Sequence, residues 1–271
     1  MAATIRPVYQ DGDPPHQRMA SAQHVLVRSL LALFHAQPYT ERLVKWGTRL
    51  HDDFLLPHFV KHDLADALSY VRERGFDLDP EWFEPHYQFR FPFYGQMVKD
   101  SVVLEVRGAL EPWHVLGEES SAGGQSRYVD SSLERIQIKA QGLVAGRHLV
   151  CVNGIEVPLR PTDVVGEGVA GVRYRAWQPP SCLHPTIGMD GPLHIDLFDT
   201  WNGRSISGCT YHVVHPGGRS AVDRPVNAVA AESRRIARFE RGGHLPRRYE
   251  PKRLGVNPDF PLTLDLRLTR P

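Results

Sequence analysis

The chain has 271 residues, of which 41% are hydrophobic and 23% are charged, and 32 basic residues nearly balance 31 acidic ones. This balance excludes a basic field over the whole protein of the kind that attracts nucleic acid, and it excludes an acidic tail. The 22 prolines and 23 glycines predict many turns, and therefore a β-rich body with loops.

The N-terminal sequence MAATIRPVYQDGDPPHQ lacks the apolar core of a signal peptide. The longest apolar run, residues 29–34, is too short to span a bilayer. The three cysteines, Cys151, Cys182 and Cys209, have no metal-like spacing. We therefore expect a cytoplasmic protein with reduced thiols that binds neither membrane nor nucleic acid.

Two helices are predicted in the first third of the chain. Residues 18–38 place apolar side chains at spacings of three and four, from Met19 to Phe34, and Pro38 ends the pattern. A second helix fits residues 62–75, with Asp63 as its N-cap and Gly75 as the left-handed residue after its end. The segment between them, WGTRLHDDFLLPHF, is expected to be a loop.

From residue 86 the hydrophobic period becomes two, which predicts strands. YQFRFPF and VVLEVRGAL are expected to pair as antiparallel strands, followed by ERIQIKAQGL. Two stretches with Asn-Gly between alternating apolar runs predict hairpins, at 148–159 and 193–215. A late helix at 226–240 and a last strand at 261–268 complete the pattern.

The resulting fold class is α+β: N-terminal helices, then a mainly antiparallel β body with one late helix. Residues 1–13 carry no pattern, and no internal repeat or low-complexity linker divides the remainder. A single domain over residues 14–271 is therefore favoured.

The motif HDDFLLPH brings His51, Asp52, Asp53 and His58 together in sequence. Imidazole and carboxylate groups are suitable ligands for zinc, manganese or iron. The alternative is an exposed polar loop without a ligand.

Glu105 and Arg107 are two apart on a predicted strand, so both side chains point to one face. They could form an ion pair, or they could provide a carboxylate for a divalent cation beside a guanidinium for phosphate. Gln88 and Arg90 repeat the spacing with a neutral amide, which is a poorer cation ligand.

Arg173 and Arg175 share one face of another predicted strand, and Tyr174 takes the other face. Arginines that point inward require acids or anions as partners, which makes a phosphate or carboxylate partner plausible. A solvated strand face is the alternative.

In the segment CTYHVVHPGGR, a strand would point His212 and His215 to opposite faces, which argues against a zinc site there. The turn at 215–219 could instead form an anion-binding nest from the amides of Gly217 and Gly218 together with Arg219. A plain glycine turn is an equally good interpretation. The sequence contains no dinucleotide fingerprint, Walker A lysine, H-E-x-x-H or G-x-S-x-G motif.

Seven blocks together resemble one bacterial family. The blocks are WGTRLHDDFLLPHF, EWFEPHYQFRFPFYG, ALEPWHVLGEE, RYVDSSLERIQ, GVAGVRYRAWQPP, LHPTIG and GCTYHVVHPGGR. The family is a large domain described as an amidoligase, which often follows a transglutaminase-like domain and is remotely similar to glutamine synthetase and glutamate–cysteine ligase. The resemblance covers roughly residues 14 to 245.

This resemblance implies ATP-dependent joining of a carboxylate to an amine through an acyl phosphate, with magnesium or manganese. Carboxylates and imidazoles would hold the cations, and arginines would neutralise the phosphoryl group. The candidates are therefore as follows: catalytic, Arg107, Arg127, Arg204 and Arg219; nucleotide-binding, Arg173, Arg175, Gly217 and Gly218; metal ligands, His51, Asp52, Glu105, Glu134 and His215.

Two departures from the family pattern shape the expected activity. The chain resembles only the C-terminal part of family members, and Gln88 stands where the family is expected to carry Glu. The expected protein is therefore a partial or split ligase that acts on a peptide or amino acid, and its partner would be a separately encoded amidoligase or transglutaminase-like piece; whether the chain is active or inactive alone is left open. The alternative is a non-catalytic β-rich binding or scaffold module, or a truncated remnant.

Overall fold

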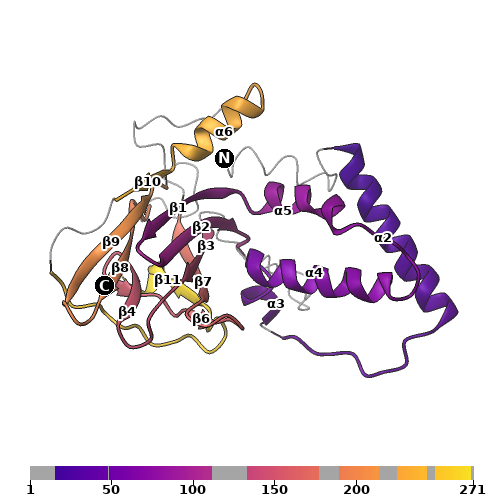
Figure 1. Cartoon of the computed structure of the whole chain (residues 1–271), viewed down its shortest axis with the longest axis horizontal. Coiled ribbons are helices and arrows are strands. Elements are labelled where there is room, and N and C mark those ends of the chain that lie inside the picture. Colours follow the sequence, from indigo (N-terminus) through magenta and orange to yellow (C-terminus); the bar gives the residue numbers. More distant parts are fainter. Residues whose placement is uncertain are drawn as a thin grey trace, which may run out of the picture.

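The computed structural model describes residues 16–47, 49–111, 133–176, 189–213, 225–242 and 248–269. It shows two β-sheets packed face to face and a helical layer beside the first sheet (Figure 1). The α+β class expected from the sequence is confirmed: helices come first, the strands are mostly antiparallel, and one helix follows late.

The first sheet presents its strands in the order β1, β2, β3, β7, β11, with β6 also paired to β7. All pairs are antiparallel except β11 on β7, which is parallel. The bounds are β1 Phe93–Lys99, β2 Val102–Ala109, β3 Leu133–Gln141, β6 Arg160–Pro161, β7 Gly168–Arg175 and β11 Thr263–Asp265.

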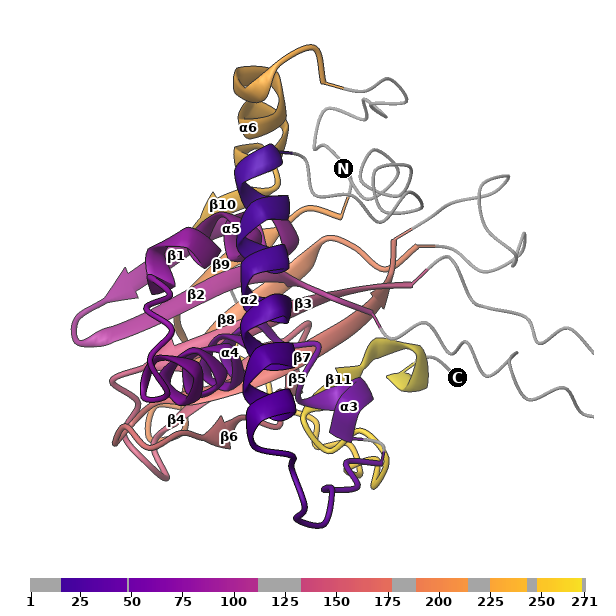
Figure 2. The ribbon, with the colours of Figure 1, turned by 90° about the vertical axis from the view of Figure 1, so that its right-hand side faces the viewer.

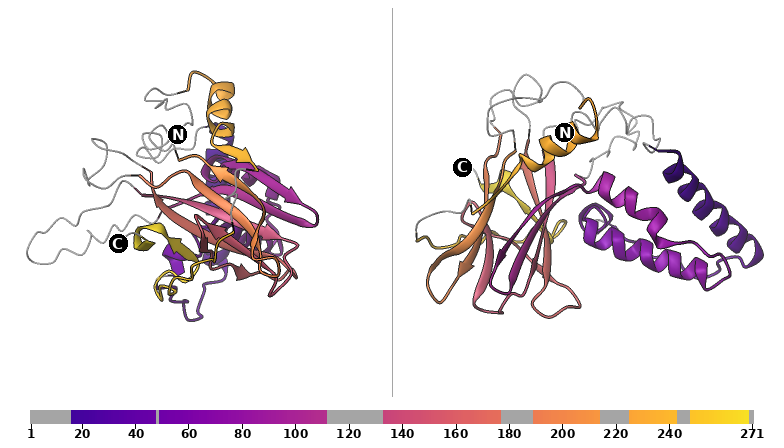
Figure 3. Two further views of the ribbon diagram at one scale, coloured as in Figure 1. Left: turned by 90° about the vertical axis from the view of Figure 1, so that its left-hand side faces the viewer. Right: turned by 45° about the horizontal axis from the view of Figure 1, so that its top comes forward.

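The second sheet has the order β10, β9, β8, β4, β5 and is antiparallel throughout. Figure 3 (right) shows the two sheets as one body with the N-terminal helices, in indigo and purple, to its side. The bounds are β4 His148–Val152, β5 Ile155–Glu156, β8 Leu193–Asp199, β9 Arg204–Tyr211 and β10 Phe239–Arg241.

The main core lies between the sheets and follows from period-two alternation. On β2, Val102, Leu104 and Val106 are buried, whereas Glu105 and Arg107, which alternate with them, are partly exposed on the outer face. The second sheet contributes residues such as Val150, Ile195, Leu197, Cys209 and Tyr211 to the same core.

The helical layer has a smaller core of its own, formed around Ala22, Leu68, Val71, Leu78 and Phe83. Figure 2 shows α2 crossing the helical side of the molecule. The bounds are α2 Gln17–Ala36, α3 Arg49–Asp52, α4 Pro57–Arg72, the 3₁₀ helix η1 Pro80–Phe83, α5 Glu84–Arg90, α6 Ala228–Ile236 and the 3₁₀ helix η2 Leu266–Thr269.

Several expected elements are present. The first helix is α2, the late helix is α6 with Asn227 as its N-cap, and both Asn-Gly hairpins form as β4–β5 and β8–β9. In the first hairpin Asn153 and Gly154 have φ values of 51° and 81°, as a tight two-residue turn requires.

The apolar face that the spacing predicts on α2 is only partly buried, since Val25 and Phe34 on it are 42% and 39% exposed. Only one narrow face of this helix packs, against α4 and η1. Val27, Leu31 and Phe34 form a second apolar stripe, which is exposed on the described surface.

The segment YQFRFPF was expected to be a strand, and this is wrong for its first four residues. They belong to α5, where Pro85 occupies the first turn, and the strand begins only at Phe93. The alternating aromatic residues mimic a strand, but the Tyr87 hydroxyl reaches the backbone carbonyl of Lys61 on α4, 3.3 Å away.

Two other boundaries differ from expectation. Helix α4 begins at Pro57, so Asp63 lies inside the helix and does not cap it. The last strand is short because the Asp265 side chain accepts a hydrogen bond from the backbone N–H of Arg267 at 3.1 Å, which turns the chain into η2.

Among the residues that the structure describes, no helix is long and apolar enough to cross a membrane. Cys151 and Cys209 are buried free thiols, and Cys182 lies outside the described residues.

We expect any side chain at position 95 to destabilise the fold, because β1 of the first sheet and β10 of the second sheet lie close together there. A Cβ on Gly95 of β1 would collide with the ring of Phe239 on β10. We expect Gly95→Ala to lower the free energy of unfolding by about 1–3 kcal/mol, measured by urea denaturation. Gly255→Ala is the matched control, because no atom lies within 4 Å of its Cβ position. Equal stability of Gly95→Ala and the wild type would contradict close packing of β1 against the Phe239 ring of β10.

Candidate functional site

The outer face of the first sheet carries polar and charged side chains on neighbouring strands, and helix α4 contacts this sheet at β2. The outward positions of neighbouring strands align in rows across the sheet by register. One row is Arg107, Gln137, Gly171 and Thr263, and the next is Ala109, Arg135, Arg173 and Asp265.

A groove of about 350 Å³ lies between this face and the helices α4 and α5, and we call it the strand–helix groove. Its lining is rich in polar and charged groups that face each other across the cavity. The helices contribute His58, Lys61 and Tyr87, and the strands contribute Glu105, Arg107 and Lys139.

Most charged groups of the groove are paired. The Arg107 Nε donates to Glu105 Oε1 at 2.6 Å, and Lys139 Nζ lies 3.0 Å from a carboxylate oxygen of Glu167. These side chains are held in place, yet Glu105, Arg107 and Lys139 keep about a quarter of their surface exposed. The groove can therefore present both signs of charge to a bound molecule.

His58 is the group in the groove best suited to accept a proton. Burial lowers the pKa of its imidazole, and the nearby Lys139 and His62 lower it further. Its backbone N–H donates to the Gln137 side-chain oxygen at 2.9 Å, which fixes the start of α4 on β3. The imidazole is therefore neutral at neutral pH.

A second cavity of about 320 Å³ lies near the C-terminal segment, and we call it the C-terminal hollow. Residues 253–257 and 260–261, the end of β5, and strands β7 and β11 surround it. Its charged lining residues are Arg173 and Asp265 on the strands and the paired Glu156 and Arg253.

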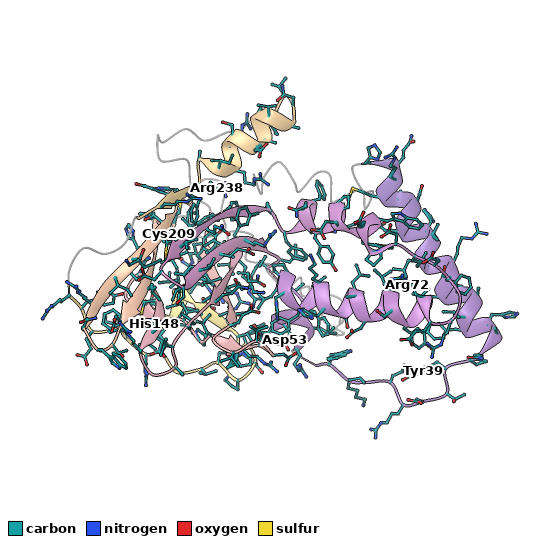
Figure 4. All side chains as sticks on the ribbon, in the orientation of Figure 1. Tyr39, Asp53, Arg72, His148, Cys209 and Arg238 are labelled. Carbon is teal, nitrogen blue, oxygen red and sulfur yellow. The ribbon has the colours of Figure 1, made fainter. Side chains whose placement is uncertain are left out.

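Between the two cavities, a fully buried ion pair attaches the α3–α4 junction to the first sheet. Arg135 Nη2 donates to Asp52 Oδ1 at 2.7 Å, and both side chains are at most 1% exposed. The same carboxylate accepts from the Thr263 hydroxyl at 2.5 Å and from the Leu262 N–H at 2.8 Å. Asp53, labelled in Figure 4, lies beside it at the boundary of the helical layer.

The buried guanidinium needs the glycine beneath it. A Cβ on Gly171 would occupy the position of the Arg135 guanidinium. Glycine on β7 thus allows the charged group to lie flat on the sheet within reach of Asp52.

A second buried group of charges surrounds Arg173. Its Nε lies 2.7 Å from Glu111 Oε1, and its Nη1 donates to Asp265 Oδ2 at 3.3 Å. Burial nevertheless raises the pKa of Glu111 to about 7, although Arg173 opposes that shift. The physical reason is that neither Glu111 oxygen accepts a well-aligned hydrogen bond among the described residues, so the proximity of Arg173 does not offset desolvation.

The structure brings some predicted site residues together and separates others. Glu105 and Arg107 share the groove, as expected from their spacing, and Arg173 and Arg175 share a strand face opposite Tyr174. Glu134 lies on the inner face, where it accepts from the Tyr174 hydroxyl at 3.1 Å, so it cannot join Glu105 in one site.

The remaining predicted residues lie apart from the groove or cannot be placed. Arg204 is exposed at the start of β9 in the second sheet, and Asp52 is buried against Arg135. Within the described ranges, no group of three or more His, Cys, Asp or Glu residues could hold a metal ion. The residues outside the described part are Arg127, His215, Gly217, Gly218 and Arg219, together with the side chain of His51.

Several residues of these sites were not among the candidate site residues chosen from the sequence. Lys139 and Arg135 alternate with Ile136 and Ile138 in ERIQIKAQ, a pattern that predicts one polar face. Strand β2 shows the same alternation of polar and apolar residues as this β3 sequence. The two patterns together could have indicated a polar surface shared by the two strands. Lys61 and Glu111 carry no such signal, because only the tertiary fold brings them to the cavities.

Comparison with known families identifies the chain. A family model described as "Putative amidoligase enzyme (DUF2126)" matches residues 12–267. The chain belongs to this amidoligase family. The match spans the helical layer, both sheets and all lining residues of the two cavities except Leu268. The family description supports a ligase-type function in general. No curated protein and no solved structure matches it.

The Asp52–Arg135 pair predicts strongly non-additive effects on stability. Asp52→Leu or Arg135→Met alone leaves a buried charge without its partner, which we expect to cost about 3–5 kcal/mol in urea denaturation. The double variant should be less destabilised than the sum of the two, because no uncompensated charge remains. Fully additive costs would show that the two side chains do not form a buried pair.

Glu111 predicts a pH-dependent stability. Its pKa in the folded protein is raised from 4.5 to about 7, so its contribution is fully present below pH 4.5 and is lost as the pH rises through about 7. Relative to Glu111→Gln, the wild type should lose about 3 kcal/mol of unfolding free energy between pH 4.5 and 8. A constant difference between the two proteins over that range would contradict the raised pKa.

Proposed function

We propose that the chain is an ATP-dependent carboxylate–amine ligase whose reacting groups meet in the strand–helix groove. Membership of the amidoligase family supports the reaction class. The observation that carries the location is the neutral imidazole of His58 opposite the Arg107 and Lys139 cations in one cavity. An amide ligase requires both functions, a proton acceptor and anion-binding groups.

The proposed reaction has two steps. A carboxylate oxygen attacks the γ-phosphorus of ATP, ADP leaves, and an acyl phosphate forms. The amine nitrogen then attacks the acyl carbon, phosphate leaves with the former carboxylate oxygen, and the amine loses a proton. In this scheme His58 accepts that proton, because its lowered pKa keeps the imidazole unprotonated at neutral pH.

The cations of the groove would bind the anionic groups of both steps. Arg107 presents its guanidinium over the Phe93 ring, 5.0 Å from the ring centroid, and its Nε donates to Glu105. Lys139 lies on the neighbouring strand, in register with Glu105. An entering carboxylate or phosphate can form charge-assisted hydrogen bonds with both cations. Glu105 can in turn orient an ammonium group.

The family resemblance also implies magnesium or manganese, which would need carboxylate ligands in the groove. Glu105 is bound to Arg107, and Glu84 is bound to Lys61 and Gln88. The described residues therefore do not fit a divalent-cation site made of protein ligands alone. The scheme above assigns no step to a metal ion.

The proposal predicts a defined pattern of activities. With ATP, a panel of amino acids and dipeptides, and hydroxylamine as the amine, acyl phosphate is trapped as hydroxamate while ADP is released. Arg107→Met should reduce both products by about 10²-fold or more, because it removes stabilisation of transferred charge. His58→Gln should reduce amide formation with a protonated amine by about 10²–10⁴-fold. It should leave hydroxamate formation, with a nucleophile that is largely unprotonated at neutral pH, much less affected.

Arg28→Ala is the matched control, because Arg28 lies exposed on α2, away from the groove. Absence of ADP, phosphate and hydroxamate with every substrate pair would remove the ligase proposal for the chain alone. The assay is then repeated with an added amidoligase or transglutaminase-like piece, the partner predicted from the sequence. If the mixture is also inactive, calorimetry with Mg-ATP tests the alternative of a binding module.

A further inference from the structure

The C-terminal hollow contains a buried charged group with an unused donor. The Arg173 side chain is 1% exposed and lines the hollow. Its Nη2 has no hydrogen-bond partner among the described residues. An unpaired buried donor of this kind is rare in native proteins, because it loses its water without gaining a partner.

The other sides of the Arg173 guanidinium are occupied. Glu111 lies against Nε, and Asp265 accepts from Nη1. The ring of Phe260 covers the guanidinium, with its centroid 4.6 Å from Cζ. Asp265 is also bound by the Arg267 side chain, with a shortest distance of 2.6 Å. Nη2 is thus the part of Arg173 that remains free to bind a further group.

The rest of the lining is mixed: Glu156 and Arg253, which pair with each other at 2.5 Å, add charged groups at one side, and apolar residues form much of the remainder. Leu254, Val256, Phe260, Pro261 and Leu268 line the same cavity. A volume of about 320 Å³ is at the lower end of the range of small-molecule sites, which favours a small ligand. The α3–α4 junction separates this cavity from the strand–helix groove, and the two cavities share no lining residue.

We propose that the C-terminal hollow binds a small monocarboxylate with a short apolar chain. The carboxylate accepts a hydrogen bond from Arg173 Nη2, and the chain packs against the apolar residues of the lining. A single negative charge suits the site better than a phosphate dianion, because Asp265, and Glu111 when it is ionised, flank the guanidinium and would repel a second charge. The site is independent of the ligase reaction proposed for the groove.

Calorimetry with the full chain tests this site with three probes. Hexanoate is the expected ligand, hexan-1-ol has the same chain without the charge, and inorganic phosphate has charge without the chain. We expect hexanoate to bind at least about tenfold more tightly than hexan-1-ol, as one charge-assisted hydrogen bond predicts. Equal binding of the two, or tighter binding of phosphate, would overturn the proposal.

A substitution that fills the C-terminal hollow with a side chain tests where the ligand binds. Gly255 lines the cavity, has no atom within 4 Å of its Cβ position, and does not have a left-handed φ. Gly255→Phe should therefore occupy the hollow without disturbing the buried charges, and weaken hexanoate binding at least tenfold at unchanged Tm. Val165→Phe is the control, because Val165 is fully exposed and does not line the cavity. Unchanged binding to Gly255→Phe would place the ligand elsewhere.

Two further variants separate this site from the groove. His58→Gln and Arg107→Met alter the groove alone and should bind hexanoate as the wild type does. Loss of binding in these variants would move the carboxylate to the groove and overturn the proposal, whether or not the ligase activity is found. If Arg173→Gln remains folded, it should lose the preference for hexanoate over hexan-1-ol.

Discussion

The buried ion pair of Asp52 and Arg135 is the constraint on which the arrangement of both cavities depends. Its members are 83 residues apart, and the same carboxylate binds Thr263, 211 residues away. One side chain thus joins the helical layer, the centre of the first sheet and its last strand. A buried pair gains little net stability over an apolar contact, because desolvation is costly. Its fully hydrogen-bonded carboxylate fixes where the α3–α4 junction lies.

That position divides a continuous polar face into two sites of different character. On one side α4 begins at Pro57 and places His58 over β3, so the groove is lined by paired charges and a neutral imidazole. On the other side the chain near β11 closes over Arg173, leaving a hollow whose wall combines apolar side chains with a few charged groups. A mixed polar groove suits a reaction that handles several charged groups, whereas the hollow suits a single ligand with an apolar body.

Much of the fold could be read from local pattern. Strict alternation in β2 and β7 assigned Glu105 and Arg107 to one face and separated Tyr174 from its arginine neighbours, and Asn-Gly turns located two hairpins. The same reasoning failed at residues 87–90, because alternating aromatic residues satisfy a strand period while packing as a short helix against α4. Local spacing cannot distinguish the two arrangements when the segment is only seven residues long.

The sequence by itself determined the class of the fold, the faces on which its polar strand residues lie and the resemblance to the amidoligase family. Only the tertiary structure decided which charges meet. Asp52 stands beside three other potential metal ligands in the sequence, yet its carboxylate binds Arg135, and Glu134 is hydrogen-bonded inside the sandwich. The physical reason is that side-chain direction follows from local backbone geometry, whereas the partner of a buried charge is chosen by strands and helices that meet from distant parts of the chain.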